Sequence, residues 1–268
     1  MKRIAFIAVL ALLSLGACKS PETKLVIIHT NDTHSHSDPL RDGRGGAIER
    51  AAFIDSVRAS RGADNVLLLH AGDFSQGTSY FTVMKGDLEI DLLNAMKYDC
   101  VTLGNHEFDN GLEELGRRLS SLKCPVVCAN YDFSPFEAGK YITPYTIVRK
   151  AGIKIGIIGL LADIRSVVSR ETADRMPLLG SWEEIANKWA AYLKDEAGCD
   201  KVLLLTHIGY DEDCKLASKL HNVDLIVGGH SHTTLKAPAF IQDADGKTVP
   251  VLQDSYWGLE MGEFSFVN

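Results

Sequence analysis

The chain has 268 residues and a formal net charge of −7, with hydrophobic residues at 46% and charged residues at 24%. This balance is typical of a globular protein with a sizeable core. The negative charge argues against a nucleic-acid scaffold, because tracking phosphates requires clustered Lys and Arg. No Pro/Gly/Ser-rich linker, repeat or low-complexity tract marks a domain boundary, so we expect one large α/β domain.

The N-terminus resembles a bacterial lipoprotein signal. Lys2 and Arg3 precede an apolar run over residues 4–15, and the small residues Gly16 and Ala17 stand directly before Cys18. We therefore predict a signal peptide with its lipidation cysteine at residues 1–18, a short tether at 19–24, and the folded domain at 25–268. The mature protein would be an exported lipoprotein, anchored to a membrane and facing the periplasm or the cell surface. An ordinary secretory peptide is the alternative, and the run is shorter than the roughly 20 residues of a membrane span.

The hydrophobic pattern along the chain predicts alternating strands and helices. Apolar runs predict strands at residues 25–29, 66–70, 100–103, 125–129, 145–149, 154–160, 201–206 and 224–228, with shorter strands near 239–242, 250–254 and 262–267. Amphipathic patterns predict helices at residues 46–60, 89–96, 112–122, 182–196 and 213–220. This order is typical of a layered α/β domain.

Five short clusters of polar residues follow these apolar runs. They are Asp32-x-His34, Gly72-Asp73, Gly104-Asn105-His106-Glu107, His207 and Gly228-Gly229-His230-Ser231-His232. Ligands in α/β proteins bind at the carboxyl ends of strands, so one edge of the fold could gather all five clusters. Any one of these residues alone would be read as a turn former, a helix cap or a satisfied core histidine. As an ordered set they indicate a site.

The residue types suit a pair of divalent cations that share one carboxylate. Asp73 is the natural bridge between the two ions. Asp32, His34 and His232 would complete one metal, and Asn105, His207 and His230 the other. Nitrogen and oxygen ligands of this kind suit Zn, Mn and Fe equally, so the sequence leaves the metal open.

At this point the chain resembles the calcineurin-like metallophosphoesterase superfamily. Three segments resemble its 5′-nucleotidase branch: His29-Thr-Asn-Asp-Thr-His34, Ala71-Gly-Asp-Phe-Ser-Gln-Gly77 and Thr102-Leu-Gly-Asn-His-Glu-Phe-Asp109. The resemblance runs from about residue 25 to the C-terminus. It implies a four-layer αββα sandwich and hydrolysis of phosphate esters, most often of nucleotides, by a hydroxide that bridges two metals.

The same resemblance implies roles for individual residues. His106 would face the substrate as electrophile or acid, with Asp109 holding its tautomer, and Glu107 would not be a ligand. Asn105 and Asn130 would lie near the substrate. For the remaining histidines we expect structural roles for His29 and His70 and solvated positions for His36 and His221, although His36 could touch the substrate.

Substrate and partners stay open in the sequence. Related 5′-nucleotidases carry a C-terminal domain that holds the base, and we expect no room for such a domain in the sequence up to Asn268. We therefore carry several alternatives: a separate chain that contributes this domain, a 2′,3′-cyclic phosphodiesterase or broad phosphomonoesterase, and a non-catalytic subunit.

Five cysteines follow Cys18. Cys124 and Cys128 share one face of a predicted strand, too far apart for a relaxed local disulfide. We expect buried free thiols, with a Cys199–Cys214 disulfide as the alternative.

Overall fold

The computed structural model describes residues 25–165 and 167–266. The predicted signal peptide, lipidation cysteine and tether lie outside these residues. Within the described part of the chain, no helix is both long and apolar enough to cross a membrane.

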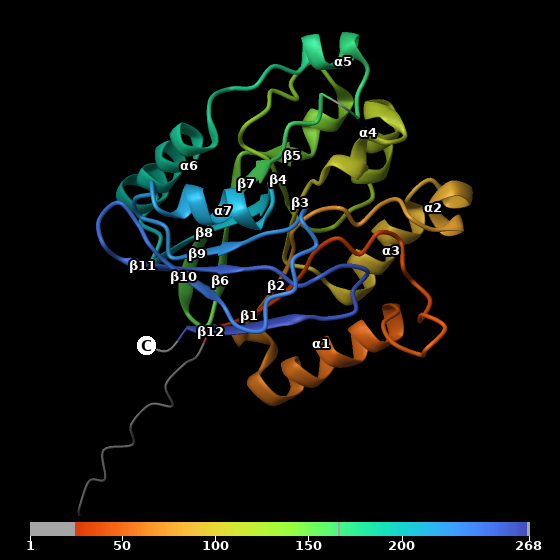
Figure 1. The fold of residues 1–268 in the computed structure, drawn as a ribbon, viewed down its shortest axis with the longest axis horizontal. Helices are drawn as coiled ribbons and strands as arrows, with labels where there is room; N and C mark the ends of the chain where they lie inside the picture. The colour runs from red at the N-terminus through yellow and green to blue at the C-terminus, as the bar shows by residue number, and fades with distance from the viewer. Residues whose placement is uncertain (1–24, 166, 267–268) are drawn as a thin grey trace, which may run out of the picture.

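The fold is built on two six-stranded sheets that pack face to face (Figure 1). The first sheet has the order β12-β1-β2-β3-β4-β5. Its strands are Gly262–Phe266 (β12), Leu25–Thr30 (β1), Val66–His70 (β2), Cys100–Thr102 (β3), Val126–Val127 (β4) and Ile142–Thr143 (β5). All neighbours are parallel except β12, which runs antiparallel to β1 at the edge.

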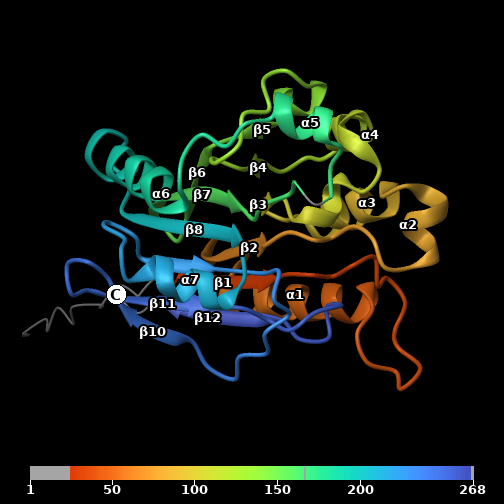
Figure 2. The same cartoon turned by 45° about the horizontal axis from the view of Figure 1, so that its top comes forward.

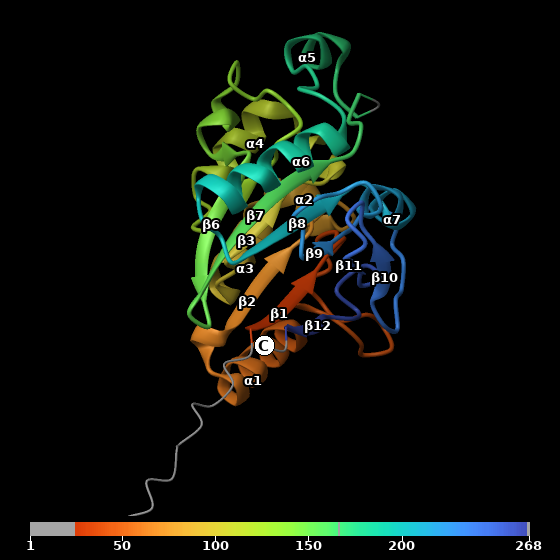
Figure 3. The same cartoon turned by 90° about the vertical axis from the view of Figure 1, so that its left-hand side faces the viewer.

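The second sheet has the order β10-β11-β9-β8-β7-β6. Its strands are Ala239–Gln242 (β10), Thr248–Leu252 (β11), Leu225–Val227 (β9), Lys201–His207 (β8), Ile153–Leu161 (β7) and Tyr145–Lys150 (β6). The four central strands are parallel, and both edge strands are antiparallel to their neighbours. In Figure 3 the arrows of β1, β2, β7 and β8 end toward the same end of the molecule.

Helices cover the outer face of each sheet (Figure 2). Against the first sheet pack α1 (Ala47–Arg61), α3 (Asp87–Met96) and α4 (Gly111–Leu119), and against the second pack α6 (Trp182–Ala191) and α7 (Tyr210–Ala217). Alternate residues of one strand enter different cores: Val26 and Ile28 face the helices, while Leu25 and Ile27 face the second sheet. Strands buried on both faces explain the continuous apolar runs of the sequence. The predicted four-layer αββα sandwich is confirmed.

The two sheets are joined directly where β4 meets β7. Ala129 N–H donates to Gly159 O at 2.8 Å, and a Cβ added at Gly159 would collide with the backbone of Val127. Only glycine permits this approach of two backbones. The two layers are therefore held at a fixed distance close to the ends of the strands.

Most expected elements are present, and the differences are short. Residues 182–196 are α6 followed by a π-helical turn over Tyr192–Glu196. The short helices α2 (Ser79–Met84) and α5 (Arg170–Arg175) and the two-residue β5 have no counterpart in the prediction. A segment of six residues or fewer spans too few turns to show a periodicity, so its sequence gives no distinct signal. The cysteines of the described residues are all free, Cys199 and Cys214 included.

Candidate metal centre

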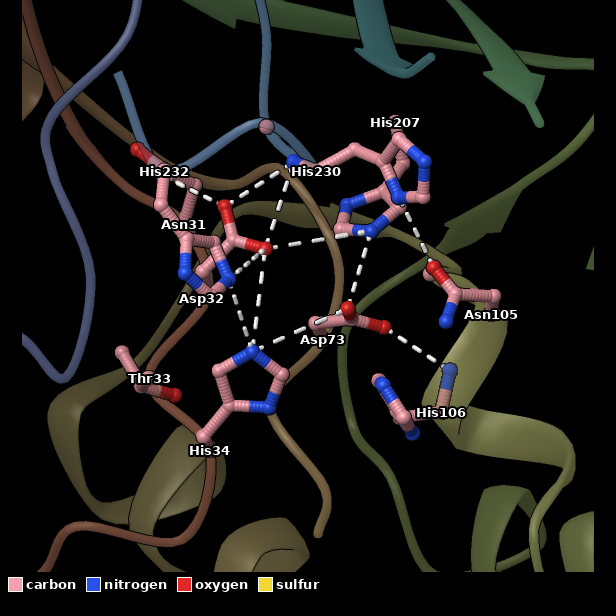
Figure 4. Close-up of polar contacts among 12 residues, drawn as sticks. Asn31, Asp32, Thr33, His34, Asp73, Asn105, His106, His207, His230 and His232 are labelled. Carbon is pink, nitrogen blue, oxygen red and sulfur yellow. Dashed lines mark hydrogen bonds and ion pairs between the residues drawn. The ribbon is translucent and has the colours of Figure 1, made fainter. Parts of the chain in front are cut away.

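The five clusters meet at one edge of the sandwich, where side chains from both sheets converge (Figure 4). The first sheet contributes the loops after β1, β2 and β3, which carry Asp32, His34, Asp73 and Asn105. The second sheet contributes the last residue of β8 and the loop after β9, which carry His207, His230 and His232. The site therefore exists only where the two sheets are packed together.

One group consists of Asp32, His34 and His232. His34 Nε2 lies 3.1 Å from His232 Nε2 and 3.9 Å from Asp32 Oδ1, and His232 Nε2 lies 3.4 Å from the same oxygen. Two ring nitrogens and a carboxylate oxygen thus point at a common position, which is the arrangement of a metal site.

A second group consists of Asp73, His207 and His230. Asp73 Oδ2 lies 3.0 Å from His207 Nε2, and His230 Nδ1 lies 2.9 Å from Asn105 Oδ1, so the amide oxygen joins this group. The same Asp73 oxygen is 3.8 Å from His34 Nε2 in the first group. Asp73 therefore stands between the two groups.

Five of these seven residues have a left-handed backbone. Asp32, His34, Asp73, His230 and His232 have φ values of 47°, 45°, 53°, 80° and 54°. Such values are uncommon outside glycine and carry a conformational cost that surrounding contacts must offset. Their concentration at one site indicates that the turns after the strands are shaped to aim side chains, at some expense in stability.

Two residues that sequence reasoning did not select hold these turns in place. The Asn31 side chain donates to Asp32 Oδ2 at 2.6 Å and accepts from Asp254 N–H. Glu107 is fully buried and accepts from the backbone N–H groups of Gly104, Asp73 and Ser75 at 2.5–3.0 Å. Glu107 is therefore a backbone clamp between two ligand loops, in agreement with the expectation that it is not a ligand. In the sequence, only the position of Glu107 inside the Gly-Asn-His-Glu motif indicates that it belongs to the site.

Backbone carbonyls fix the tautomers of two histidines. His207 Nδ1 lies 2.7 Å from Ala71 O, and His34 Nδ1 lies 3.3 Å from Ser75 O. Because a carbonyl only accepts, each Nδ1 carries a proton, and each Nε2 faces the ligand position, where a bound cation would take the place of any proton.

The electrostatics of the site favour positive charge. Burial lowers the pKa of His207, but Asp73 and Asp32 raise it by more, to about 10. Burial would raise the pKa of Asp73, yet His207 and His34 hold it below its usual range. Carboxylates that attract a proton this strongly attract a cation for the same reason.

The donor set fits two divalent cations. His207 Nε2 is fully buried and, although Asp73 Oδ2 lies 3.0 Å away, makes no well-directed hydrogen bond, as is expected of an atom placed to bind a metal. A Cβ at Gly72 would lie 2.7 Å from His207 Nδ1, so the turn leaves room for the ring only because the residue is glycine. Imidazole, carboxylate and amide donors suit Zn, Mn and Fe.

His106 and Asp109 lie beside this centre. His106 Nδ1 is 2.9 Å from Asp109 Oδ2, across a 3₁₀ turn at Asn105–Phe108. His106 N–H donates to Asp73 Oδ1 at 2.9 Å, which ties the pair to the central carboxylate. Burial lowers the pKa of His106, and the hydrogen bond to Asp109 and the charge of Asp73 raise it above its ordinary value.

Asn130 does not join the other site residues. It is fully buried, its Nδ2 donates to Leu161 O at 2.8 Å, and its Oδ1 accepts from Leu161 N–H at 2.9 Å. Both amide atoms bond to Leu161 of β7, so Asn130 links the first sheet to the second, and its contact with the substrate stays a prediction. An asparagine at the end of a strand looks the same in the sequence whether it contacts a substrate or links two sheets.

The other histidines lie outside the two groups. His29 and His70 are buried, and His70 Nε2 pairs with Thr33 Oγ1 at 3.1 Å. His221 is exposed and pairs with Asp245 at 2.8 Å. His36 stacks on Trp257 with 4.2 Å between ring centroids.

Comparison with known proteins assigns the class that this geometry suggests. Residues 25–234 match the calcineurin-like phosphoesterase family, and the chain belongs to that family. The snake venom 5′-nucleotidase of Naja atra is 36% identical over 89% of this chain and 49% of its own length, and the human 5′-nucleotidase is 32% identical over 94% and 48%. The crystal structure of a 5′-nucleotidase precursor from Thermus thermophilus superposes with a TM-score of 0.81 at 34% identity, covering 91% of this chain and 54% of that one. The likeness to the 5′-nucleotidase branch is thus confirmed, and the chain spans about half the length of the curated relatives it matches.

Proposed function

We propose that the chain hydrolyses phosphate monoesters, with 5′-nucleotides as the preferred substrates, at a centre of two divalent metal ions. The observation that carries the proposal is the convergence of seven donor side chains beside the His106–Asp109 pair. Similarity to 5′-nucleotidases from several organisms supports the nucleotide as substrate.

Each side chain has a role in this proposal. Asp32, His34 and His232 would hold one ion, Asn105, His207 and His230 would hold the other, and Asp73 stands between the two groups and would be shared. When bound, a pair of divalent cations supplies Lewis-acid polarisation and lowers the pKa of water. The protein contributes donors that are already oriented, since backbone contacts fix their rings before substrate arrives.

His106 acts on the substrate itself. Asp109 accepts the Nδ1–H bond, so His106 presents Nε2 to the phosphoryl group or to the leaving oxygen. From there it stabilises negative charge on a phosphoryl oxygen or gives a proton to the departing alkoxide. Asn105 directly precedes His106 in the same 3₁₀ turn. We propose that its amide contacts the phosphoryl group of the substrate as well as the metal.

A substrate panel tests the proposal. Protein purified without chelator and assayed for metal content would be given AMP, a UDP-sugar, a 2′,3′-cyclic nucleotide and an aryl phosphate. We expect AMP to have the highest kcat/KM. Preferred turnover of the cyclic nucleotide would instead support a cyclic phosphodiesterase, and equal turnover of all the monoesters a broad phosphomonoesterase. Absence of turnover by fully loaded protein would support a non-catalytic subunit.

A partner and a location complete the proposal. A separate chain with a nucleotidase C-terminal domain would supply further contacts to the base, and the half-length match to the relatives supports testing for it. A pull-down from native membranes that recovers only this chain, together with full nucleotide turnover by it, would contradict such a partner. We also propose that Cys18 carries a lipid anchor after export. Fatty-acid labelling that is lost in Cys18→Ser would support this, and equal labelling of both would contradict it.

A further inference from the structure

A run of four aromatic rings leads away from the metal centre. Tyr256 stacks on His232 with 5.1 Å between centroids and 30° between planes. Trp257 meets Tyr256 edge to face at 4.8 Å, and His36 stacks on Trp257 at 4.2 Å and 15°. The His232 side chain is 39% exposed, and the other three residues are partly exposed. The rings therefore form part of the surface that borders the site.

The backbone of the loop that carries Tyr256 and Trp257 is anchored without the two rings. Trp257 N–H donates to Asp32 O at 2.6 Å, Ser255 N–H donates to Thr233 O at 3.0 Å, and Asn31 Nδ2 donates to Ser255 O at 2.9 Å. These bonds hold the loop against both ligand turns. The backbone of the loop is thus anchored by contacts that do not involve the two aromatic side chains.

Conformational strain points to function. Ser255 and Trp257 have φ values of 49° and 58°. A left-handed backbone is unfavourable for a bulky aromatic residue, where glycine or asparagine would be accommodated at lower cost. A strained aromatic residue beside a ligand loop is the kind of outlier from which a functional role is inferred.

We propose that Tyr256 and Trp257 form a stacking platform for the planar aromatic group of the substrate, which for a nucleotide is the base. The inference rests on the proposed function and names the substrate class: phosphate esters whose leaving group carries an aromatic ring. Tyr256 lies between His232 and Trp257, with centroid distances of 5.1 Å and 4.8 Å. The distance from His232 to Trp257 is therefore comparable with the distance that a ribose sets between a base and its 5′-phosphate. Stacking on aromatic side chains accepts any base, so the platform favours nucleotides without selecting among them.

The test compares AMP with ribose 5-phosphate, which has the same phosphate ester and no base. In Trp257→Leu we expect the ratio of kcat/KM for AMP to that for ribose 5-phosphate to fall roughly 5- to 150-fold, the range of one stacked base. Trp257→Phe keeps an aromatic face and should recover most of the ratio. Phe240→Leu is the matched control, because Phe240 is a 61% exposed aromatic residue on the edge strand β10. It should leave the ratio as in the parent.

A binding measurement separates this inference from the proposed function. The metal-loaded His106→Ala variant is titrated with AMP while tryptophan fluorescence is recorded. Quenching that is lost on adding Trp257→Phe supports the platform, whether or not the parent turns AMP over, because the other two tryptophans lie on α6. Unchanged quenching, or equal loss of AMP and ribose 5-phosphate turnover in Trp257→Leu, would show that the rings only support the metal loops and would overturn the proposal.

Discussion

Gly104 packs so closely on Asp73 that a Cβ at residue 104 would overlap the Asp73 carboxylate. The backbone of Gly104 is extended, with φ of −103° and ψ of −177°, so alanine there meets a steric conflict and no conformational one. We expect Gly104→Ala to displace Asp73 and reduce metal content at both positions, as measured by elemental analysis. Gly152→Ala is the control: its φ is +73° and its surroundings are open, so it should cost about 1 kcal/mol of stability and leave metal content unchanged. Full metal loading of Gly104→Ala would contradict the bridging position of Asp73.

His106→Ala should separate catalysis from metal binding. A positioned acid or base contributes about 10²–10⁴-fold to a rate, so kcat should fall by that factor while metal content is retained. Asp109→Asn keeps the shape of the pair and removes the charge that orients the ring, so we expect a smaller loss in the same direction. The roles assigned to both residues would fail if His106→Ala were as active as its parent.

Asp73→Asn should weaken both metals together. The Asp73 oxygen lies 3.0 Å from His207 Nε2 and 3.8 Å from His34 Nε2, which places one carboxylate in both groups. Asn keeps the size but removes the negative charge that two cations would share. We expect metal stoichiometry to fall well below two per chain, whereas His232→Ala should affect the first group more than the second. An unchanged stoichiometry in Asp73→Asn would refute the bridge.

Asn130→Ala should reduce stability more than substrate affinity. The change leaves the buried N–H of Leu161 without its Asn130 partner, at a cost of roughly 1–3 kcal/mol, while Leu161 O keeps its bond from Trp182 Nε1. Urea unfolding measures the loss, and the KM for AMP serves as the comparison. A large rise in KM with unaltered stability would instead support the role in substrate binding that the sequence suggested.

Asp213 introduces a pH dependence of stability. Burial raises the pKa of Asp213 from its ordinary value of 3.8 to about 8. Between pH 3.8 and pH 8 the folded protein therefore keeps a proton that the unfolded chain has released. Stability therefore falls as the pH rises between these two values, by up to about 1.4 kcal/mol per pH unit. Asn at this position still accepts the hydrogen bond from Thr206 at Oδ1 and has no proton to lose.

Urea unfolding of the parent and Asp213→Asn at pH 5.5, 6.5 and 7.5, at one fixed metal concentration, measures this effect. We expect the parent to lose stability more steeply than the variant. Parallel profiles would show that Asp213 keeps the same charge when folded and unfolded.

The sequence predicts the layers and the donor residues because both depend on local patterns. Runs such as Leu25–Thr30 are buried on both faces, and polar residues directly after them are at strand ends by necessity. Which atoms of those residues face one another depends on turns with left-handed φ and on the backbone groups that Glu107 binds, and the Gly-Asn-His-Glu motif does not show which groups these are. The contacts of Asn130 with Leu161 have the same cause, because the packing of the two sheets decides whether this amide meets solvent or the opposite sheet.

The division of the donors between the sheets has a consequence for folding. Four of them, Asp32, His34, Asp73 and Asn105, belong to the first sheet, and His207, His230 and His232 belong to the second. Neither layer alone can assemble the centre, so all seven donors come together only when the layers dock. During refolding, regained turnover should lag behind regained circular dichroism, and added divalent ion should accelerate the last step without altering the first.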